Sequence, residues 1–232
     1  MLHPTNFFDL SKCSYRELFD RKEVVWEALK LLPDFINSQS KPRIYGEINK
    51  LAWIGENVHI GKGTIVEPNV TIIGPAIIGS DCEIRAGAYV RKNVIIGDEV
   101  IVGHSTEIKA SILLNNVTVP HLAYVGDSIL GWKAHLGAGV IISNVKLDNT
   151  PIKVRIGDQL FDTGLLKLGA IVGDLVEVGC NSVLNPGTFV GKRTMAYPNS
   201  SLRGYYPPDS IIKLRQSHEV TSREVINEAP EK

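Results

Sequence analysis

The dominant feature of the chain is an aliphatic residue at every sixth position. From Ile54 to Pro120, eleven of twelve such positions are Ile, Leu or Val. Glycine often follows the aliphatic residue, as at Gly55, Gly61 and Gly97, and the fifth position of each hexad is mostly small or β-branched. This period is typical of hexapeptide repeats and predicts an all-β solenoid, a parallel β-helix in which three hexads form one triangular coil.

The six-residue frame is interrupted once. It slips after His121 and resumes from Val172 to Leu202. A long interruption in a solenoid is usually a loop that projects from one face and often serves function. We therefore predict a β-helix domain over residues 43–215 that carries an inserted, projecting loop at residues 143–167.

The flanking segments follow other patterns. Residues 14–37 carry apolar residues at helical spacing, Ser14 and Glu17 match a capping box, and Pro33 interrupts the pattern. We expect one or two helices, so that residues 1–42 form a helical cap and linker. Such a cap would close the open edge of the first coil. Residues 216–232 form a polar tail, expected to be a short helix or disordered.

Composition narrows the possible partners and compartments. The 232 residues have a formal net charge of +0, which gives no reason to expect a nucleic acid or a membrane surface as partner. The three cysteines, Cys13, Cys82 and Cys180, form no CxxC pair, and a reducing cytoplasm fits best. We identify no signal peptide and no membrane-spanning run.

Polar residues replace the expected glycine at several second positions of the hexads. Arg91 and Lys109 are separated by a whole triangular coil of three hexads, so they would stack on the same outer patch. Two stacked cations favour an anion between them, and a phosphate is a natural candidate. The alternative is a solvated pair with acidic neighbours such as Asp98 or Glu107.

His121 also occupies a second position in this frame, with Gly103 expected directly beneath it. A glycine below a histidine leaves a notch that suits a small substrate, although it also suits a plain turn. His104, His121 and His135 are widely spaced along the chain, with no two of them close together in sequence, and this spacing does not favour a metal site. We predict no metal, and a proton-transfer role for His121 competes with a structural one.

Two stretches carry a family resemblance. The residues from Tyr89 to Ile141, which include EIK and HLAYVGD, resemble the acetyltransferase domain of the bifunctional bacterial enzyme that makes UDP-N-acetylglucosamine. The segment LGAIVGDLVEVGCNSVLNPGTFVG is similar to the C-terminal domain of archaeal sugar-1-phosphate nucleotidylyltransferases. Together they cover most of the chain from about Gly46, more weakly through Arg215. The EIK and HLAYVGD spacing is specific, whereas the generic hexads are not.

The resemblance implies a fold and an activity. The fold would be a left-handed β-helix that works as a homotrimer with active sites between subunits. The activity would be acetyl transfer from acetyl-CoA to the amine of an amino sugar 1-phosphate such as glucosamine-1-phosphate, within nucleotide-sugar biosynthesis for the cell envelope. We find no N-terminal nucleotide-binding domain in the sequence, so nucleotidyl transfer is not expected.

The resemblance also implies roles for individual residues. His121 matches the general base and Glu107 an acidic residue near it. Arg91 and Lys109 match the pair that holds the sugar phosphate, and Tyr124 matches a sugar-site tyrosine. His121 would take a proton from the amine, and a backbone N–H near Ala138 or Asn144 would face the oxyanion.

The remaining matches include departures from the family pattern. His135, where the family has asparagine, and Lys153, across a longer loop, match sugar-site positions. The positions that would contact the acetyl group or coenzyme A are Ala138, Asn144, Cys180, Pro198 and Arg215. Cys180 replaces a serine, Pro198 an alanine, and Val145 a tyrosine.

These departures leave two alternatives open. The chain could be a non-catalytic β-helix subunit that binds a sugar nucleotide or sugar phosphate. It could also acylate another sugar from a different acyl donor. Acetyl transfer itself would require no metal.

Overall fold

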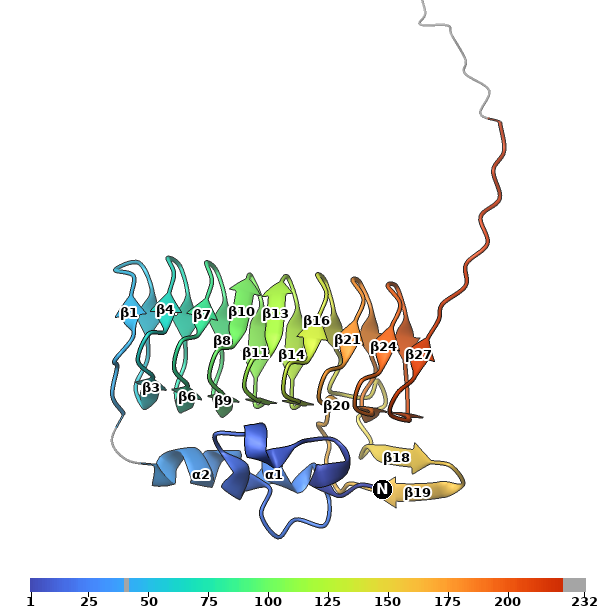
Figure 1. Cartoon of the computed structure of the whole chain (residues 1–232), viewed down its shortest axis with the longest axis horizontal. Coiled ribbons are helices and arrows are strands. Elements are labelled where there is room, and N and C mark those ends of the chain that lie inside the picture. Colours follow the sequence, from blue (N-terminus) through green and yellow to red (C-terminus); the bar gives the residue numbers. More distant parts are fainter. Residues whose placement is uncertain (40–41, 223–232) are drawn as a thin grey trace, which may run out of the picture.

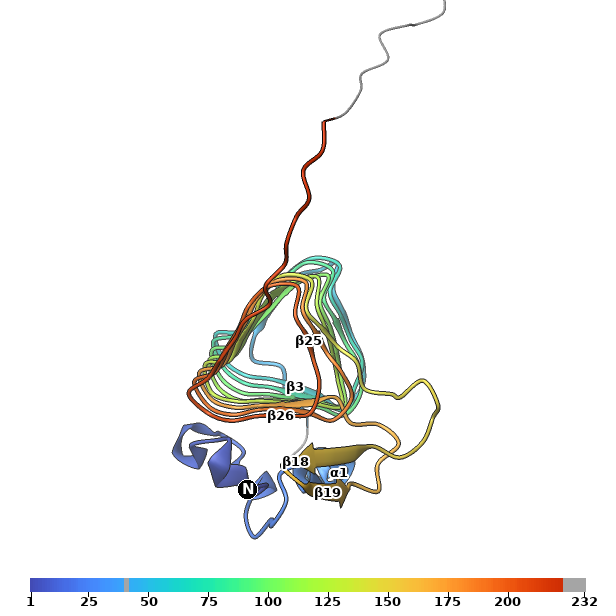
Figure 2. The ribbon, with the colours of Figure 1, turned by 90° about the vertical axis from the view of Figure 1, so that its right-hand side faces the viewer.

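A computed structural model describes residues 1–39 and 42–222 and shows a solenoid, triangular in cross-section, with a helical segment and a hairpin beside it (Figures 1 and 2). Each turn contributes one short strand to each of three parallel sheets, here called sheets I, II and III. In this part of the chain sheet I has nine strands and sheets II and III have eight each, so the solenoid makes eight complete turns and begins a ninth.

The strands are short, two to four residues each. Sheet I contains β1 (Glu47–Ile48), β4 (Ile65–Val66), β7 (Glu83–Ile84), β10 (Ile101–His104), β13 (Thr118–His121), β16 (His135–Leu136), β21 (Glu177–Val178), β24 (Met195–Ala196) and β27 (Ile211–Ile212). Sheet II contains β2 (Trp53–Ile54), β5 (Thr71–Ile72), β8 (Tyr89–Val90), β11 (Glu107–Lys109), β14 (Tyr124–Gly126), β17 (Ile141–Ile142), β22 (Val183–Leu184) and β25 (Ser201–Leu202). Sheet III contains β3 (Val58–Ile60), β6 (Ala76–Ile78), β9 (Val94–Ile96), β12 (Ile112–Leu113), β15 (Ile129–Leu130), β20 (Ala170–Val172), β23 (Thr188–Val190) and β26 (Tyr205–Tyr206).

The solenoid is left-handed. Seen from the C-terminal end, the chain runs clockwise from β25 to β26 while it advances toward the viewer (Figure 2). Clockwise rotation on approach defines a left-handed helix. The prediction of a left-handed parallel β-helix is confirmed.

The interior is a stack of aliphatic side chains, one from each strand. In sheet II the paired residues Ile72, Val90, Ile108, Val125 and Ile142 lie above one another and are fully buried. Burying each such side chain contributes about 1.5–3 kcal/mol relative to exposure. The six-residue period therefore exists because each face must send one apolar side chain inward.

The period is broken earlier than the sequence frame indicates. Glu107 pairs with Tyr89, exactly three hexads before it, whereas Ile112 pairs with Ile95, which is one position short of three hexads. One residue is thus missing from the corner between sheets II and III. The inward positions consequently move by one, and Leu113 points into the core where the frame predicted Leu114.

Buried serines close this shortened corner. The Ser111 hydroxyl donates to the carbonyl oxygen of Lys109 at 2.7 Å and accepts the backbone N–H of Ser128 at 3.1 Å. One coil further on, the Ser128 hydroxyl donates to the carbonyl of Gly126 and accepts the N–H of Ala170. Both serines are fully buried, so their hydroxyls satisfy backbone groups that no water reaches.

Sheet III is buried on both of its faces. Its outward column is apolar, and Ile95, Ile112, Ile129, Ile171 and Phe189 are all completely buried. These side chains pack against the N-terminal segment and the hairpin. An uncovered apolar column of this length would attract other apolar surfaces, so the chain covers it with its own segments.

The N-terminal segment covers this column and does not close the first coil, contrary to the prediction. It contains η1 (Pro4–Asn6), η2 (Leu10–Lys12), η3 (Arg16–Leu18), α1 (Glu27–Lys30) and α2 (Leu32–Ser38). These elements lie alongside sheet III (Figures 1 and 2). The capping-box prediction was also wrong, because the Ser14 hydroxyl donates to Asp98 at 2.6 Å. The break falls before α2, whose first turn accommodates Pro33.

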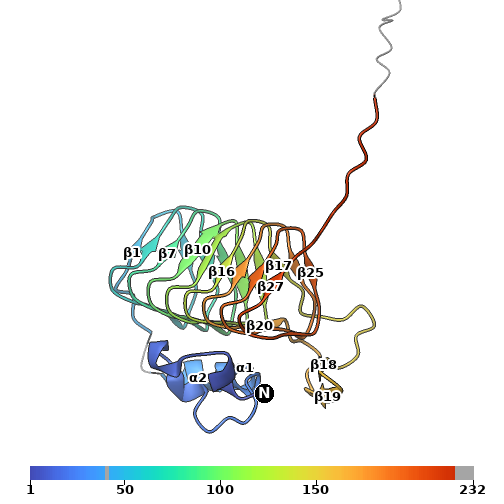
Figure 3. The same ribbon diagram turned by 45° about the vertical axis from the view of Figure 1, so that its right-hand side comes forward.

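The interruption after Asn144 forms an antiparallel hairpin, β18 (Lys153–Ile156) paired with β19 (Gln159–Asp162). It projects beside the C-terminal coils (Figure 3). Ile152, Val154 and Ile156 are buried and join the apolar cluster outside sheet III. The insertion is therefore anchored along one face and exposed along the other.

Beyond β27 the described residues 213–222 form no helix or strand and are largely exposed. Residues 223–232 of the tail lie outside the described residues. Within the described part of the chain, no helix combines the length and apolar character needed to cross a bilayer.

Asp174 fastens the N-terminal segment to the solenoid. Its carboxylate accepts the backbone N–H of Asp9 at 2.5 Å and that of Trp132 at 2.8 Å, and its own N–H donates to the carbonyl of Phe7. The residue is 3 % exposed, and burial raises its pKa.

We predict that Asp174→Ala lowers the free energy of unfolding by about 2–3 kcal/mol, because two N–H groups lose their acceptor. Urea denaturation measures this change, and limited proteolysis reports faster cleavage within residues 1–39. The control is Asp20→Ala, since Asp20 is exposed and lies 4.0 Å from Arg16. Equal urea midpoints and equal cleavage rates for both variants would contradict this role.

Candidate functional site

An exposed column of residues follows the corner between sheets I and II. In this column, backbone hydrogen bonds join each turn to the next: Leu122 N–H to His104 O (2.9 Å), Gly139 N–H to His121 O (3.2 Å), Asn181 N–H to Ala138 O (2.9 Å) and Asn199 N–H to Cys180 O (2.9 Å). We call His104, His121, Ala138, Cys180 and Pro198 the corner column. The structure thus brings together four residues that the resemblance assigns to catalysis and acyl binding.

His121 points outward, as predicted, but from a different position of the hexad. Because the frame has already slipped, the inward residue of β13 is Val119 and His121 is third. His104 lies beneath it, and Gly103 lies beneath Pro120, whose carbonyl a Cβ on Gly103 would strike. The predicted notch of Gly103 under His121 is therefore wrong.

The imidazole of His121 is exposed and forms no hydrogen bond or ion pair with the described residues. By contrast, His104 Nδ1 lies 2.7 Å from the carbonyl oxygen of Ala86. Both ring nitrogens of His121 are thus open to a substrate, and either one, when unprotonated, can accept a proton as a general base does.

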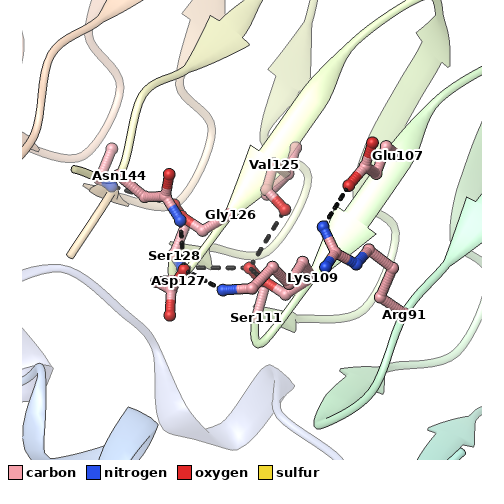
Figure 4. A network of polar contacts seen from close by, with 10 residues as sticks. Arg91, Glu107, Lys109, Ser111, Val125, Gly126, Asp127, Ser128 and Asn144 are labelled. Atoms are coloured by element: carbon pink, nitrogen blue, oxygen red, sulfur yellow. Dashed lines mark hydrogen bonds and ion pairs between the residues drawn. The ribbon is translucent and has the colours of Figure 1, made fainter. Parts of the chain in front are cut away.

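A line of polar residues lies along the outer side of sheet II and reaches its corner with sheet III (Figure 4). It consists of Arg91, Glu107, Lys109, Asp127 and Asn144, and we call it the polar ladder. Arg91 Nη1 lies 2.8 Å from Glu107 Oε1, and Lys109 Nζ lies 2.7 Å from Asp127 Oδ2. The Asn144 amide donates to the same Asp127 oxygen.

The ladder stacks Arg91 and Lys109 as predicted, but each cation has a carboxylate partner. Lys109 and Asp127 are mostly buried, with side chains 20 % and 16 % exposed, whereas the Arg91–Glu107 pair is more open. The repulsion that suggested an intervening phosphate is therefore already relieved by the protein. A phosphate at this place would share the cations with Glu107 and Asp127.

The Tyr124 side chain lies over Gly126 on the outer side of sheet II. Gly126 pairs with Lys109 of the preceding coil. A Cβ on Gly126 would lie 2.6 Å from the Tyr124 hydroxyl and 2.9 Å from the Asn144 amide nitrogen. Burial raises the pKa of Tyr124, and the negative charges of Asp127 and Glu107 add to this effect. The hydroxyl therefore stays protonated at neutral pH and can donate a hydrogen bond.

The other predicted site residues lie further away or face elsewhere. His135 lies on β16 with its Nδ1 2.6 Å from the Thr118 hydroxyl. Lys153 is on the exposed face of the hairpin, and Arg215 is in the exposed extended segment after β27. Within a single chain these residues do not join the corner column.

Sequence reasoning missed Asp127, which holds both Lys109 and Asn144. The signal was present, because Asp127 closes the HLAYVGD stretch. Among residues 1–39 and 42–222, no group of three or more His, Cys, Asp or Glu side chains is arranged to hold a metal ion.

The fold is that of a hexapeptide-repeat, left-handed parallel β-helix. The sequence matches the GMPPB C-terminal domain family over residues 72–197, and the chain belongs to this family. The predicted resemblance to that group of proteins is confirmed.

Curated relatives include a bifunctional protein GlmU of Methanococcus maripaludis, 33 % identical over 198 residues, which cover 85 % of this chain and 48 % of the relative. A bifunctional sugar-1-phosphate nucleotidylyltransferase/acetyltransferase of Sulfurisphaera tokodaii is 34 % identical over 90 residues, 39 % of this chain and 22 % of the relative. The matched part is thus half or less of these relatives. Among solved structures, an Arabidopsis UDP-N-acetylglucosamine acyltransferase aligns with a TM-score of 0.41 and 15 % identity, covering 72 % of this chain and 69 % of that one.

The Asp127 contacts predict a measurable share of stability. We expect Asp127→Ala to lower the free energy of unfolding by about 1–2 kcal/mol, because Lys109 and Asn144 lose their partner in a largely buried place. The matched control is Asp209→Ala, which breaks the exposed Arg193–Asp209 pair and should leave the urea midpoint unchanged. Equal midpoints for the two variants would show that Asp127 has no special structural role.

Proposed function

We propose that the chain is an acetyltransferase that moves the acetyl group of acetyl-CoA to the amine of an amino sugar 1-phosphate similar to glucosamine-1-phosphate. The supporting observation is that His121 is exposed, has no partner among the described residues, and lies in one column with Ala138, Cys180 and Pro198. The polar ladder lies on the adjoining face, sheet II. Membership of the GMPPB C-terminal domain family and relatives named as acetyltransferases add support.

The proposed step is a direct acyl transfer. The nitrogen of the sugar amine attacks the thioester carbonyl while His121 takes a proton from that amine. A C–N bond forms and the C–S bond breaks. The proton then passes to the departing thiolate of coenzyme A. The Ala138 N–H donates none of the backbone hydrogen bonds found among the described residues, and it can therefore face the oxyanion.

The ladder would position the acceptor. Arg91 and Lys109 hold the sugar phosphate while sharing their charge with Glu107 and Asp127, and Tyr124 donates to a sugar hydroxyl. Glu107 pairs with Arg91. Its negative charge would therefore favour the protonated form of His121 through the electric field and not through a direct contact. His135, Lys153 and Arg215 would contribute from a neighbouring subunit.

We propose a homotrimer with sites between subunits. The outer faces of sheets I and II expose large apolar side chains, Trp53, Ile65, Ile141, Met195 and Ile211, at 39–57 %. Exposed apolar surface of this kind favours association. The free cysteines, including exposed Cys180, fit a reducing cytoplasm, which we propose as the location.

We predict that His121→Asn lowers kcat for N-acetylation by about 100-fold or more while folding and trimer formation persist. Product mass spectrometry with glucosamine-1-phosphate and acetyl-CoA measures turnover, and sedimentation measures assembly. The matched control is His104→Asn one coil earlier, which should retain turnover. Near-normal turnover by His121→Asn would refute the assignment of the base.

Calorimetry separates this function from its alternatives. Binding of acetyl-CoA and glucosamine-1-phosphate supports acetyl transfer, whereas sugar-phosphate binding without acetyl-CoA binding favours a non-catalytic subunit. A panel of amino sugar phosphates and acyl-CoAs would reveal another acceptor or donor.

A further inference from the structure

A cleft separate from the corner column lies between the hairpin and the last coils. Its volume is about 880 Å³, and its walls come from residues 143–148, the hairpin, and the turns at 185–187 and 203–205. The hairpin stands beside these coils (Figures 2 and 3). Small-molecule sites typically occupy roughly 300–1,000 Å³, so the cleft can hold a nucleotide-sized ligand.

Basic side chains line this cleft from three different segments. The lining residues include Lys146, Lys153, Arg155 and Arg203, and Asp148 is the only acidic side chain among those lining it in the described chain. The cleft therefore has a net positive charge. Cations that are far apart in sequence but gather in one hollow produce a local field that attracts anions.

Most of these cations have no partner. Lys146 Nζ lies 3.4 Å from Asp148, but the side chains of Lys153, Arg155 and Arg203 form no ion pair or hydrogen bond with described residues. In the hairpin, Asp162 pairs in register with Lys153, but its Oδ1 accepts the N–H of Gly164.

The cations of the cleft differ from those of the polar ladder in having few carboxylate partners. In the ladder, Arg91 and Lys109 each contact a carboxylate at 2.7–2.8 Å. In the cleft, the arginines keep their full set of N–H donors for an incoming group. Arginine presents these donors in a planar fork that matches phosphate oxygens.

An apolar wall accompanies the cations. Leu160, Pro186 and Tyr205 line the same cleft, and Leu160 is 51 % exposed. An inorganic or sugar phosphate would leave these side chains in water. A ligand with both phosphates and a flat ring would use the cations and the apolar wall together.

We propose that this cleft binds the nucleoside diphosphate portion of a ligand, with its phosphates on Arg155 and Arg203 and its base against Leu160 and Tyr205. Two ligands contain this chemistry: coenzyme A, through its ADP moiety, and a nucleotide sugar. The proposal that the cleft binds a nucleotide does not depend on the proposed function. The role of that nucleotide as part of a substrate rests on the proposed acetyl transfer.

Isothermal calorimetry on the full chain tests the site with ADP, UDP and inorganic phosphate as probes. We expect at least one nucleotide to bind with a Kd tenfold or more below that of phosphate. The double variant Arg155→Gln/Arg203→Gln should weaken nucleotide binding by about tenfold or more, because charge-assisted hydrogen bonds are lost. Both side chains are exposed, so the variant should fold normally.

The matched control is Arg193→Gln, which removes an exposed arginine that pairs with Asp209 outside the cleft. It should bind nucleotides as the unmodified protein does. Absence of nucleotide binding, equal affinity for phosphate, or unchanged binding by the double variant would each overturn the proposal.

Steady-state kinetics then distinguishes the two ligands. A raised KM of the double variant for acetyl-CoA assigns the cleft to the donor. An unchanged KM for acetyl-CoA, together with weakened nucleotide binding, assigns the cleft to a nucleotide sugar. Nucleotide binding by a chain that lacks acetyl transfer would refute the proposed function and leave the cleft proposal intact.

Discussion

Every other feature of this molecule depends on the continuous register between successive coils. Each short strand gains stability only because the strand before it and the strand after it complete its hydrogen bonds and bury its inward side chain. Pairs such as Ile108 with Val90 and with Val125 carry this register through the solenoid. A strand of two residues would have no independent stability.

The register also explains why one missing residue matters. When the corner after Lys109 loses a residue, all later positions shift, and buried Ser111 and Ser128 supply the hydrogen bonds that the shorter turn needs. The same corner carries the Lys109–Asp127 pair. The irregularity that the sequence pattern associates with chemistry therefore lies at the corner between sheets II and III, upstream of His121.

Charge is distributed differently at the two places where anions could bind. In the polar ladder, carboxylates neutralise the cations, so an incoming phosphate is selected by geometry more than by net charge. In the cleft beside the hairpin, basic side chains gather with few acidic neighbours. The chain thus separates a charge-balanced polar ladder from a hollow whose positive field attracts anions over a longer range.

The sequence alone determined the solenoid, because the aliphatic residue at every sixth position specifies which side chains must be inside each coil. It also indicated His121, Arg91 and Lys109 through motif and spacing. Folding in three dimensions decided the rest. The carboxylate partners of Arg91 and Lys109 come from the neighbouring coil. The place of the shortened corner fixes which residues of successive coils lie above one another.

The position of the N-terminal helices was likewise beyond the sequence pattern. Their apolar side chains require a hydrophobic surface, but periodicity does not say which one. The outward aliphatic column of sheet III appears only when the coils are stacked, because it is assembled from one residue of each coil. Local sequence therefore specifies the faces of each coil, and only the stacked structure determines which faces meet.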